Sequence, residues 1–386
     1  MTPFPTPLPD AALAARIWRP GIGPCLAALR GQTVVDITSR DLPTMQALLA
    51  KDDPAATLRA ATGAEVCTLS DLARASRSAT GPDDLRFLAP ADLQPIKAAG
   101  VTFAESMVER VIEEQAAGEA ARAEAIRARI GGIIGDSLSG LVPGSDKAAE
   151  VKRVLQEAGL WSQYLEVGIG PDAEIFTKCP PMASVGWGAD VGLHPSSRWN
   201  NPEPEIVLAA DHAGRIKGAT LGNDVNLRDF EGRSALLLGK AKDNNASCAM
   251  GPALRLFDDG YTLDHVRQAE ITLRVEGADG FVLTGVSPMT RISRDPADLM
   301  AQAVGRHHQY PDGVFLFLGT MFAPVEDREA PGQGFTHHRG DVVTITEPAL
   351  GALVNTVRLS TECPEWTFGT GALMHDLAAR GLLGHN

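Results

Sequence analysis

From residue 166 onward, short apolar runs are separated by clusters of Gly, Pro, Asn and Asp at intervals of about ten residues. The clearest runs are EIVLAAD, RIKGATLG, EITLRVEG, GFVLTG, GVFLFLG and DVVTITEP. Apolar runs bounded by turn residues are typical of strands, and their regular spacing predicts a β-sandwich or barrel. The alternation of apolar and polar positions is imperfect, so the pattern predicts the strands but not their order.

Helical periodicity precedes this region. Residues 102–134 form an Ala/Glu/Arg-rich run in which charges recur every three or four residues, which predicts one long, partly exposed helix. A second helix is predicted from Ser145, a suitable N-cap, with Asp146 in its first turn, where the helix dipole favours an anion. This second helix is expected to end before Gly168.

The N-terminal part mixes both patterns. The runs ARIWRP, GPCLAALRG and QTVVDITS predict strands within residues 15–40, and helices are predicted around 42–49 and 70–75. The polar stretch RSATGPDDLRFLAPADLQP then indicates a domain boundary, and a length of 386 residues also favours two domains. We therefore expect an α+β protein with domains 1–85 and 86–386, the second containing a helical segment at 102–165 and a β-rich core at 166–360.

Charge and cysteine content narrow the possible partners. The chain has 48 acidic and 35 basic side chains, a net charge of -13 and no Lys- or Arg-rich run, so nucleic acid is not an expected partner. Five scattered cysteines without a CxxC spacing argue against a disulfide framework or structural zinc, and favour a cytoplasmic location. The N-terminus lacks a basic region, and no apolar segment is long enough for a bilayer, so we expect a soluble protein without a membrane partner.

Paired carboxylates supply the first candidate chemistry. Glu203 and Glu205 are two residues apart in NNPEPEIVLAA, so in a strand they point to the same face, and Asp224 follows in ATLGNDVNLRD. An all-oxygen ligand set without nearby Cys or His favours Mg²⁺, Mn²⁺ or Ca²⁺. The alternative is a solvated strand face, but the apolar, Gly-rich surroundings favour carboxylates that have partners.

Lys242, in GKAKDNNA, supplies a candidate base. An amine close to a divalent cation has its charged form disfavoured and can accept a proton near neutral pH. Metal and base together indicate proton abstraction. A non-catalytic, metal-stabilised scaffold is the alternative, but a structural cation would be repelled by a nearby ammonium group.

Six segments, taken in order, carry a family resemblance. They are PDAEIFTKCPPMASVG, NPEPEIVLA, GATLGNDVNLRD, KAKDNNASCAMGP, FLGTMFAP and GDVVTI. Together they resemble the fumarylacetoacetate hydrolase superfamily over about residues 90–357, and within it the branch of 2-keto-3-deoxy-D-pentonate (arabinonate or xylonate) dehydratases matches best. The resemblance implies a mixed β-roll or barrel catalytic domain after the small N-terminal α+β domain, and assembly as a homodimer or homotetramer.

The resemblance also implies roles for individual residues. It implies Glu203, Glu205 and Asp224 as metal ligands, Lys242 as base or proton shuttle, and Glu174 in AEIFTKC as the glutamate that works opposite the lysine. Thr320 in LGTMF falls at a threonine that grips the substrate carboxylate in relatives, although Met321 replaces the proline that follows it there.

One departure from the family pattern bears on the reaction. Hydrolytic members carry a histidine and a glutamate in a segment resembling GLNYxxHxxE, where the pair activates water. Here the segment is GVTFAESMVE, with Ser106 at the histidine position and Glu109 retained. The resemblance therefore favours dehydration of 2-keto-3-deoxy-D-xylonate or arabinonate to 2,5-dioxopentanoate. The alternative is an acylpyruvate-type C–C hydrolase or a 2-keto-acid decarboxylase on the same scaffold.

Elementary chemistry gives a route for this dehydration. A 2-keto acid can chelate a cation, which stabilises the negative charge that develops when a C3 proton leaves. Lys242 is the candidate to take that proton. Glu174 is the candidate to protonate the departing C4 hydroxyl, because a carboxyl in an apolar pocket has a raised pKa. No redox cofactor is required.

Arg291 and Arg294, in GVSPMTRISRD, and Asn244, after the lysine, are further candidates for substrate binding. Guanidinium groups bind oxyanions in a bidentate manner, and an asparagine can orient hydroxyls. The alternatives are a surface ion pair between Arg294 and Asp295 and an ordinary turn role for the asparagine.

Several other residues have a structural interpretation. The histidine pairs 307–308 and 337–338 are expected to be solvated or satisfied in the core more often than catalytic. Arg228 and Asp229 are predicted to form an ion pair that steadies the ligand loop, Gly222 to allow a tight turn, and Cys248 to pack in the core.

Overall fold

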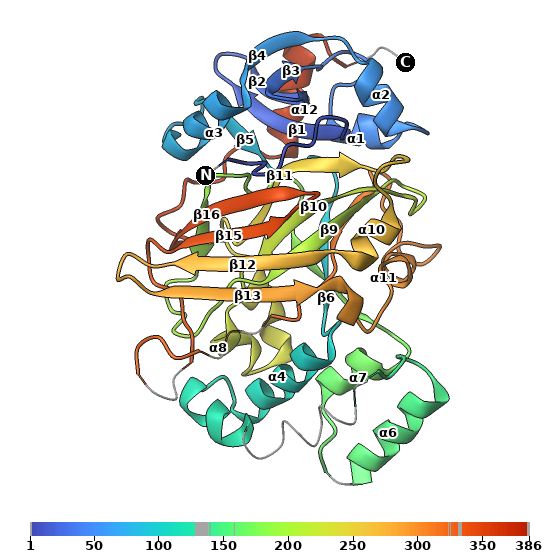
Figure 1. The fold of residues 1–386 in the computed structure, drawn as a ribbon, viewed down its shortest axis with the longest axis vertical. Coiled ribbons are helices and arrows are strands. Elements are labelled where there is room, and N and C mark those ends of the chain that lie inside the picture. Colours follow the sequence, from blue (N-terminus) through green and yellow to red (C-terminus); the bar gives the residue numbers. More distant parts are fainter. Residues whose placement is uncertain are drawn as a thin grey trace.

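The computed structural model describes residues 2–127, 138, 140–157, 159–322, 324, 326–330 and 334–383. Three regions follow one another along the longest axis: a small N-terminal unit, a β-rich core and a helical region (Figure 1). Both helices and strands contribute to the fold, so the predicted α+β class is confirmed.

The N-terminal unit is an antiparallel sheet with three helices. Its strands are β1 (Leu13–Arg19), β2 (Gly23–Arg30), β3 (Thr33–Asp36) and β4 (Ala64–Thr68), and its helices are α1 (Met45–Leu49), α2 (Pro54–Ala60) and α3 (Leu69–Ser78). The three predicted strands are confirmed as β1, β2 and β3. The helices begin where side chains cap them: the Thr44 hydroxyl accepts the Ala47 N–H at 3.1 Å, and the Thr68 hydroxyl accepts the Asp71 N–H at 3.1 Å.

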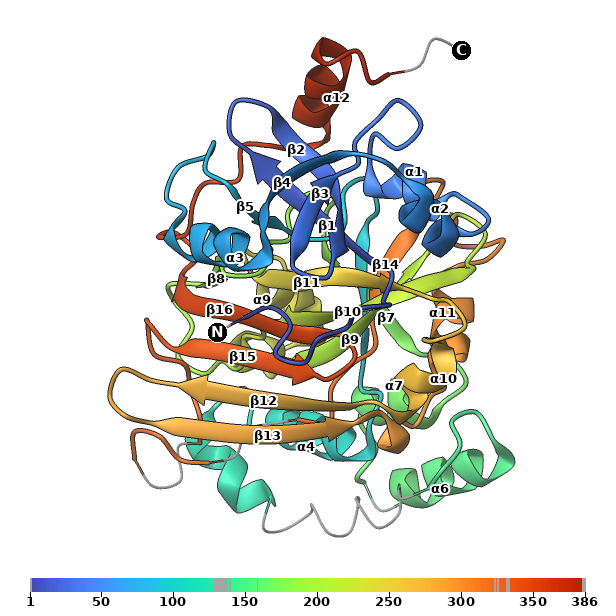
Figure 2. The same ribbon diagram turned by 45° about the horizontal axis from the view of Figure 1, so that its top comes forward.

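The end of the chain returns to this unit. Helix α12 (Thr370–Ala379) lies beside the N-terminal strands (Figures 1 and 2). Arg380 donates to the carbonyl oxygen of Pro24 at 2.8 Å, and the ring of Phe368 meets that of Trp18 edge to face, with centroids 5.0 Å apart. Strand β5 (Arg86–Leu88), which follows the predicted domain boundary at residue 85, still pairs with β1 of the N-terminal unit. The boundary therefore stays a prediction.

Two sheets form the β-rich core, and the larger one continues through the β1–β11 pairing into the strands of the N-terminal unit. The larger has 11 strands in the order β4-β3-β2-β1-β11-β10-β9-β14-β6-β7 with β5 on β1, and the smaller has five in the order β13-β12-β15-β16-β8. The core strands are β6 (Ile96–Gly100), β7 (Glu174–Cys179), β8 (Asp190–Leu193), β9 (Pro204–Ala210), β10 (Ile216–Asp224), β11 (Cys248–Leu256), β12 (Glu270–Glu276), β13 (Val282–Pro288), β14 (Val314–Phe317), β15 (Val342–Glu347) and β16 (Gly351–Leu359). All six runs predicted as strands are strands, namely β9, β10, β12, β13, β14 and β15.

Short helices complete the core and form the region below it. They are α4 (Ala104–Gln115), α6 (Asp146–Glu157), α7 (Gln163–Ile169), α8 (Arg228–Glu231), α9 (Leu238–Lys242), α10 (Leu263–Gln268) and α11 (Pro296–Ala303). Figure 1 shows α4 next to α8 and beneath the two sheets. Among the described residues, no helix combines the length and apolar character needed to cross a bilayer.

The single helix predicted over residues 102–134 is wrong. Helix α4 ends at Gln115, and Ala117 and Gly118 follow with φ of 54° and 76°. The Gly118 N–H donates to the carbonyl oxygen of Glu113 at 3.2 Å, which closes the last turn. Residues 128–134 of the predicted helix lie outside the described residues.

The second predicted helix is also divided. Ser145 begins it as expected, since its hydroxyl accepts the Ala148 N–H at 3.2 Å. Helix α6 ends before Gly159, whose φ of 68° suits glycine, and α7 then continues past Gly168 to Ile169. The predicted end before Gly168 is therefore wrong. A Cβ at Gly168 would overlap the Met107 side chain, so this glycine allows α7 to pack closely on α4.

Candidate active site

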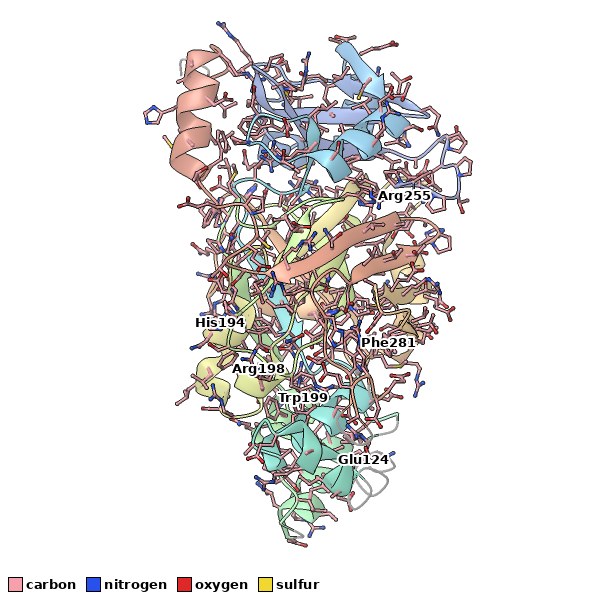
Figure 3. The ribbon with its side chains drawn as sticks, turned by 90° about the vertical axis from the view of Figure 1, so that its left-hand side faces the viewer. Glu124, His194, Arg198, Trp199, Arg255 and Phe281 are labelled. Atoms are coloured by element: carbon pink, nitrogen blue, oxygen red, sulfur yellow. The ribbon has the colours of Figure 1, made fainter. Side chains whose placement is uncertain are left out.

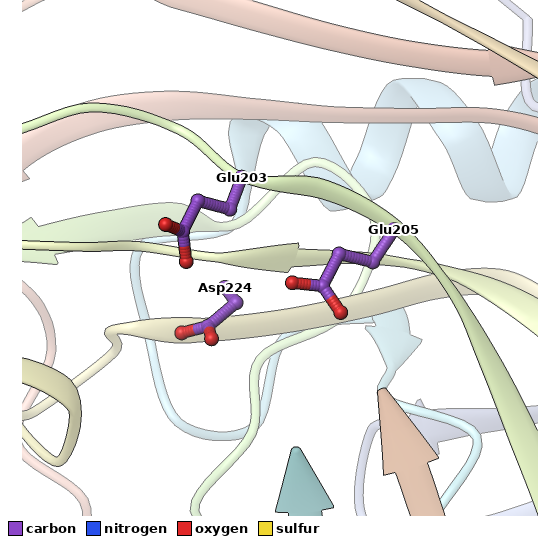
Figure 4. Close-up of side chains that lie close together, drawn as sticks. All are labelled: Glu203, Glu205 and Asp224. Atoms are coloured by element: carbon purple, nitrogen blue, oxygen red, sulfur yellow. The ribbon is translucent and has the colours of Figure 1, made fainter. Parts of the chain in front are cut away.

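Three buried carboxylates meet at the end of the β9–β10 pair. Glu205 lies opposite Gly222 in the antiparallel ladder, and the N–H of Asp224 donates to the carbonyl oxygen of Glu203 at 3.0 Å. This pairing places one carboxylate oxygen of each residue within 4.8 Å of the others (Figure 4). Glu203 immediately precedes β9 and Glu205 lies within it, and their carboxylates come together as the two-residue spacing predicts. We call the three residues the carboxylate cage.

Two lysines contact the cage. Lys242, the last residue of α9, pairs with the carboxylate of Glu203 and lies 2.9 Å from that of Asp224. Lys178 in β7 lies 2.7 Å from the other oxygen of Asp224 and is completely buried. Sequence reasoning missed Lys178, although a lysine within the apolar segment EIFTKC was a signal that it has a partner.

Positive groups compensate the negative charges of the cage carboxylates unequally. Burial acts to raise the pKa of Asp224, but Lys178 and Lys242 outweigh it and lower that pKa. Burial raises the pKa of Glu205 well above its usual range, and the charges of Asp224 and Glu203 raise it further. The backbone N–H of Gly319 donates to Glu205 at 2.6 Å and offsets only part of this.

This arrangement fits a hard divalent cation. The donor set is all oxygen and buried, which suits Mg²⁺, Mn²⁺ or Ca²⁺ better than a thiophilic metal. Burial, together with the charges of Asp224 and Glu203, raises the pKa of Glu205, and a cation at the cage would favour its ionised form. Glu203, Glu205 and Asp224 are therefore the residues that would hold the metal.

Lys242 differs from the sequence-based expectation in one respect. Burial acts to lower its pKa, but Asp224 and Glu203 outweigh burial and raise it. These two carboxylates therefore favour the charged form of the amine. The prediction of a neutral amine depends on a cation that compensates the same two carboxylates.

Glu174 begins β7 and lies opposite Gly100 of β6. A Cβ at Gly100 would overlap the Glu174 carboxylate, so the glycine provides the space in which this side chain lies. Burial raises the pKa of Glu174 to about 7, and the nearby charge of Glu231 adds to the shift. The direction is the one predicted from the sequence, and it leaves a substantial protonated fraction near neutral pH.

One cavity brings the principal candidates together. It is lined by Glu174, Glu203, Glu205, Asp224, Lys242 and Thr320. The buried Thr320 hydroxyl accepts the Phe322 N–H at 3.1 Å. Ser106 and Glu109 of α4 also line the cavity, the former bonded to the Phe103 carbonyl oxygen at 2.9 Å and the latter held by Arg127 at 2.7 and 2.8 Å.

Three predicted substrate contacts lie elsewhere. Arg291 pairs with Glu105, and both side chains are exposed at the surface. Arg294 is buried and donates to the carbonyl oxygens of Val167 at 2.8 Å and Gly170 at 2.7 Å. The Asn244 amide donates to the carbonyl oxygen of Lys240 at 2.9 Å, which makes it a turn residue. None of Arg291, Arg294 and Asn244 lines the cavity, and their contact with substrate stays a prediction.

The histidine pairs also lie outside the cavity. His307 and His308 are exposed. His337 is buried with its Nδ1 atom 3.1 Å from the Asp341 carboxylate, and the Nε2 atom of His338 lies 2.8 Å from Glu329. Among the residues that the structure describes, no histidine lines the cavity.

Arg228 and Asp229 do not pair with each other as predicted. Arg228 lies 2.7 Å from Glu113 and 4.3 Å above the ring of Trp199. Figure 3 shows Trp199 where the core meets the helical region. Asp229 instead accepts the Ser197 hydroxyl and the Arg198 N–H, both at 2.8 Å. The arginine therefore connects α8 to α4, and the aspartate holds the segment before the cage.

Gly222 does not form a turn. It lies within β10, where a Cβ would overlap the side chains of Phe317 and Val207, so close packing requires the glycine. Cys248 is buried at the start of β11, and burial raises the pKa of its thiol, which confirms the core interpretation.

Arg110 of α4 is the second residue that sequence reasoning missed. Its guanidinium lies 2.6 Å from Glu203, 2.7 Å from Glu113 and 2.8 Å from Glu231, and it lines the cavity. It was hidden in the charged periodicity of a helix predicted to be partly exposed. Burial acts to lower the pKa of Arg110, but these carboxylates raise it, so the side chain remains charged.

Known proteins resemble the chain both in sequence and in structure. The curated relatives include the 2-dehydro-3-deoxy-D-arabinonate dehydratase of Saccharolobus solfataricus, 32% identical over 48% of this chain and 58% of that protein. A probable 2-keto-3-deoxyxylonate dehydratase of Haloferax volcanii is 30% identical over 52% of this chain and 66% of that protein. The match thus spans less than two thirds of each relative.

Solved structures support the fold. The apo form of 2-keto-3-deoxy-D-arabinonate dehydratase matches 90% of this chain and 99% of its own with a TM-score of 0.63 and 21% identity. A structure of 2-keto-3-deoxy-D-arabinonate dehydratase complexed with magnesium and 2,5-dioxopentanoate has a TM-score of 0.62 and 21% identity, with 90% and 99% covered. At this identity the likeness establishes a shared architecture.

The family model of the fumarylacetoacetate hydrolase C-terminal domain matches residues 167–358, the range that contains the carboxylate cage and both lysines. Over this range, just under half of its length, the chain is similar to the fumarylacetoacetate hydrolase family.

Proposed function

We propose that the chain is a metal-dependent dehydratase that removes water from a 2-keto-3-deoxy sugar acid, 2-keto-3-deoxy-D-xylonate or arabinonate, to give 2,5-dioxopentanoate. The observation that carries the proposal is one cavity that holds the carboxylate cage, Lys242 and Glu174. The names of both curated relatives and the magnesium and 2,5-dioxopentanoate in a structural neighbour support the same reaction.

Dehydration needs a base and an acid at different carbon atoms. Lys242 is the base for the C3 proton, because it is the lysine that lines the cavity and contacts the cage. Glu174 is the acid for the C4 hydroxyl, because its pKa of about 7 allows it to hold a proton that it can donate. A bound divalent cation would supply Lewis acidity toward the 2-keto acid and would compensate the carboxylates that keep Lys242 charged.

The surroundings of the cavity favour dehydration over hydrolysis. In the family pattern the water-activating histidine falls on α4, and Ser106 occupies that position here with its hydroxyl bonded to the backbone. Arg127 donates to both carboxylate oxygens of Glu109, which also lies 3.4 Å from Arg228, so this carboxylate is already occupied. The cavity therefore offers a proton donor and acceptor for elimination without a histidine–glutamate pair for water attack.

Product analysis tests the proposal. Purified protein with Mg²⁺ should convert 2-keto-3-deoxy-D-xylonate or arabinonate into a product lighter by one water, with the carbon skeleton intact. Acylpyruvates should remain uncleaved under the same conditions. Products of C–C cleavage or release of CO₂ would instead indicate the hydrolase or the decarboxylase and would overturn the dehydratase.

The pH dependence follows from Glu174. The acid is active when protonated, and its pKa is raised to about 7, so its active fraction falls as pH rises through that value. Above this pKa, kcat/KM should fall by about tenfold per pH unit. Glu174→Gln should lose this descending limb and lower kcat by about 10²–10⁴-fold. Initial rates between pH 5 and 9, taken as about two units on either side of the pKa, measure both effects. A wild-type limb that persists in the variant would exclude Glu174 as the acid.

The assembly and the compartment are further proposals. We propose a cytoplasmic homodimer or homotetramer, which the family resemblance favours. Light scattering on the purified chain measures the assembly directly, and a monomer at micromolar concentration would contradict it.

A further inference from the structure

The cavity contains three cationic side chains with unequal freedom. The side chain of Arg228 is 2% exposed and that of Lys242 is 3% exposed, whereas that of Arg110 is 13% exposed. Arg228 is also fixed by Glu113, the Trp199 ring and the carbonyl oxygen of Pro324, which it contacts at 3.0 Å. Among these three, Arg110 is therefore best placed to reach an anionic ligand.

Arg110 contacts a carboxylate that the metal would need. One oxygen of Glu203 accepts Lys242, and the other accepts Arg110 at 2.6 Å. Both oxygens are thus already bonded to positive groups, although Glu203 belongs to the carboxylate cage. A divalent cation at the cage and Arg110 would compete for the same side chain, because like charges on one carboxylate repel each other.

The positive groups already at the cage lead to the same competition. Lys178 and Lys242 contact Asp224, and Lys242 and Arg110 contact Glu203. A divalent cation would add two positive charges beside these groups. The carboxylate of a 2-keto acid would offset part of that charge, and guanidinium is well suited to bind it in a bidentate manner.

We propose that Arg110 determines specificity for the acid group of the substrate: it pairs with Glu203 in the metal-free enzyme and exchanges that partner for the substrate carboxylate when a divalent cation is bound at the cage. Its remaining contacts, Glu113 at 2.7 Å and Glu231 at 2.8 Å, keep the guanidinium at the cavity during the exchange. The inference rests on the metal cage and the 2-keto acid of the proposed function.

Two consequences distinguish exchange from a purely structural ion pair. Removing the charge of Arg110 removes a competitor, so the metal alone should bind more tightly. The same change removes a carboxylate partner, so a 2-keto acid should strengthen metal binding less than it does in the wild type. Binding free energies are coupled reciprocally, so either ligand can be titrated.

The experiment is a calorimetric titration of Mn²⁺ into chelator-treated protein, with and without saturating pyruvate. For Arg110→Gln, Mn²⁺ alone should bind about fivefold or more tightly than to the wild type, and the gain caused by pyruvate should shrink by about fivefold or more. Arg110→Lys keeps a charge without the bidentate fork, so it should show smaller shifts of the same sign. Circular dichroism confirms the fold of each variant, and the lysine variant alone carries the test if Arg110→Gln does not fold.

Arg127→Gln is the matched control. Arg127 pairs with Glu109, a residue of α4 like Arg110, but does not contact the cage. Its variant should therefore bind Mn²⁺ and pyruvate as the wild type does. Weaker Mn²⁺ binding by Arg110→Gln, or an unchanged gain from pyruvate, would overturn the exchange. The titration involves no turnover: a chain that shows this coupling without dehydrating sugar acids would keep the inference and lose the proposed function. A chain that dehydrates sugar acids without this coupling would keep the proposed function and lose the inference.

Discussion

Lys242→Ala should lower kcat for dehydration by about 10³-fold or more while leaving the protein folded and able to bind Mg²⁺. The lysine contacts Glu203 and Asp224, so its removal takes away both the proposed base and a positive charge beside the metal ligands. Metal affinity should therefore stay equal or increase, even as turnover is lost. Steady-state rates and Mg²⁺ titration of the same preparation separate these two effects.

The chain offers a control on the same helix. Lys240 lies two residues before Lys242 in α9, is exposed and does not line the cavity. Lys240→Ala should therefore keep wild-type turnover. If Lys242→Ala also turned over at a rate near that of the wild type, the lysine would have no part in proton transfer.

The strands could be predicted because their signal is local. Each of the runs that became β9, β10 and β12 is an apolar segment bounded by turn residues, so a few neighbouring positions decide the outcome. The helix breaks could not be predicted in the same way. Gly118 lies against the backbone of Asp229, far away in sequence, and the Ala/Glu/Arg periodicity continues through the break.

The position of α12 shows the same limit at the scale of domains. Its contacts with the N-terminal unit, such as Arg380 to Pro24, join the two ends of the chain. No local pattern reports such a pairing. A division by sequence alone therefore assigns the helix to the core that immediately precedes it.

The site residues that could be predicted are also those with a local signal in the sequence. The two-residue spacing of Glu203 and Glu205 is a local signal, and the structure brings their carboxylates together. The same period on β7 places Glu174, Phe176 and Lys178 on one face, so Lys178 could have been found by extending the argument made for Glu174.

Arg110 had no such signal. Its partners Glu203 and Glu231 come from two other elements, and only the packing of α4 against the core brings them together. Arg294 shows the opposite case, since its sequence suited an anion but burial directs it to backbone carbonyl groups. Charged residues on helices and loops therefore need the tertiary structure before a role can be assigned.

Glu205→Gln should abolish Mg²⁺ binding and dehydration, yet stabilise the metal-free protein. Glu205 is the cage carboxylate without a lysine or arginine partner among the described residues, and burial with the charges of Asp224 and Glu203 raises its pKa. Glutamine keeps an oxygen that can accept the Gly319 N–H but has no charge to be repelled. Removing the charge therefore removes a cost of folding in the absence of metal and a ligand in its presence.

The sign of the pH effect provides a second measurement. A carboxyl whose pKa is raised in the folded state binds its proton more tightly there, so wild-type stability should fall as pH rises from the ordinary pKa of glutamate toward the raised value. The Glu205→Gln variant lacks this decline. Thermal unfolding of chelated protein between pH 5 and 8, a range that begins about half a unit above an ordinary glutamate pKa, compares the two slopes.

Metal dependence completes the test. Mg²⁺ at about 100 times its Kd should stabilise the wild type by about 2.7 kcal/mol and should not stabilise Glu205→Gln. Chelator treatment should abolish wild-type turnover, and added Mg²⁺ should restore it. Glu276→Gln, a change at a carboxylate of β12 that is not part of the cage, should respond to Mg²⁺ as the wild type does. A cation coordinated by the cage should bind more weakly when one of the three carboxylate charges is lost. An equal Mg²⁺ response from Glu205→Gln would therefore mean that the three carboxylates have a structural role.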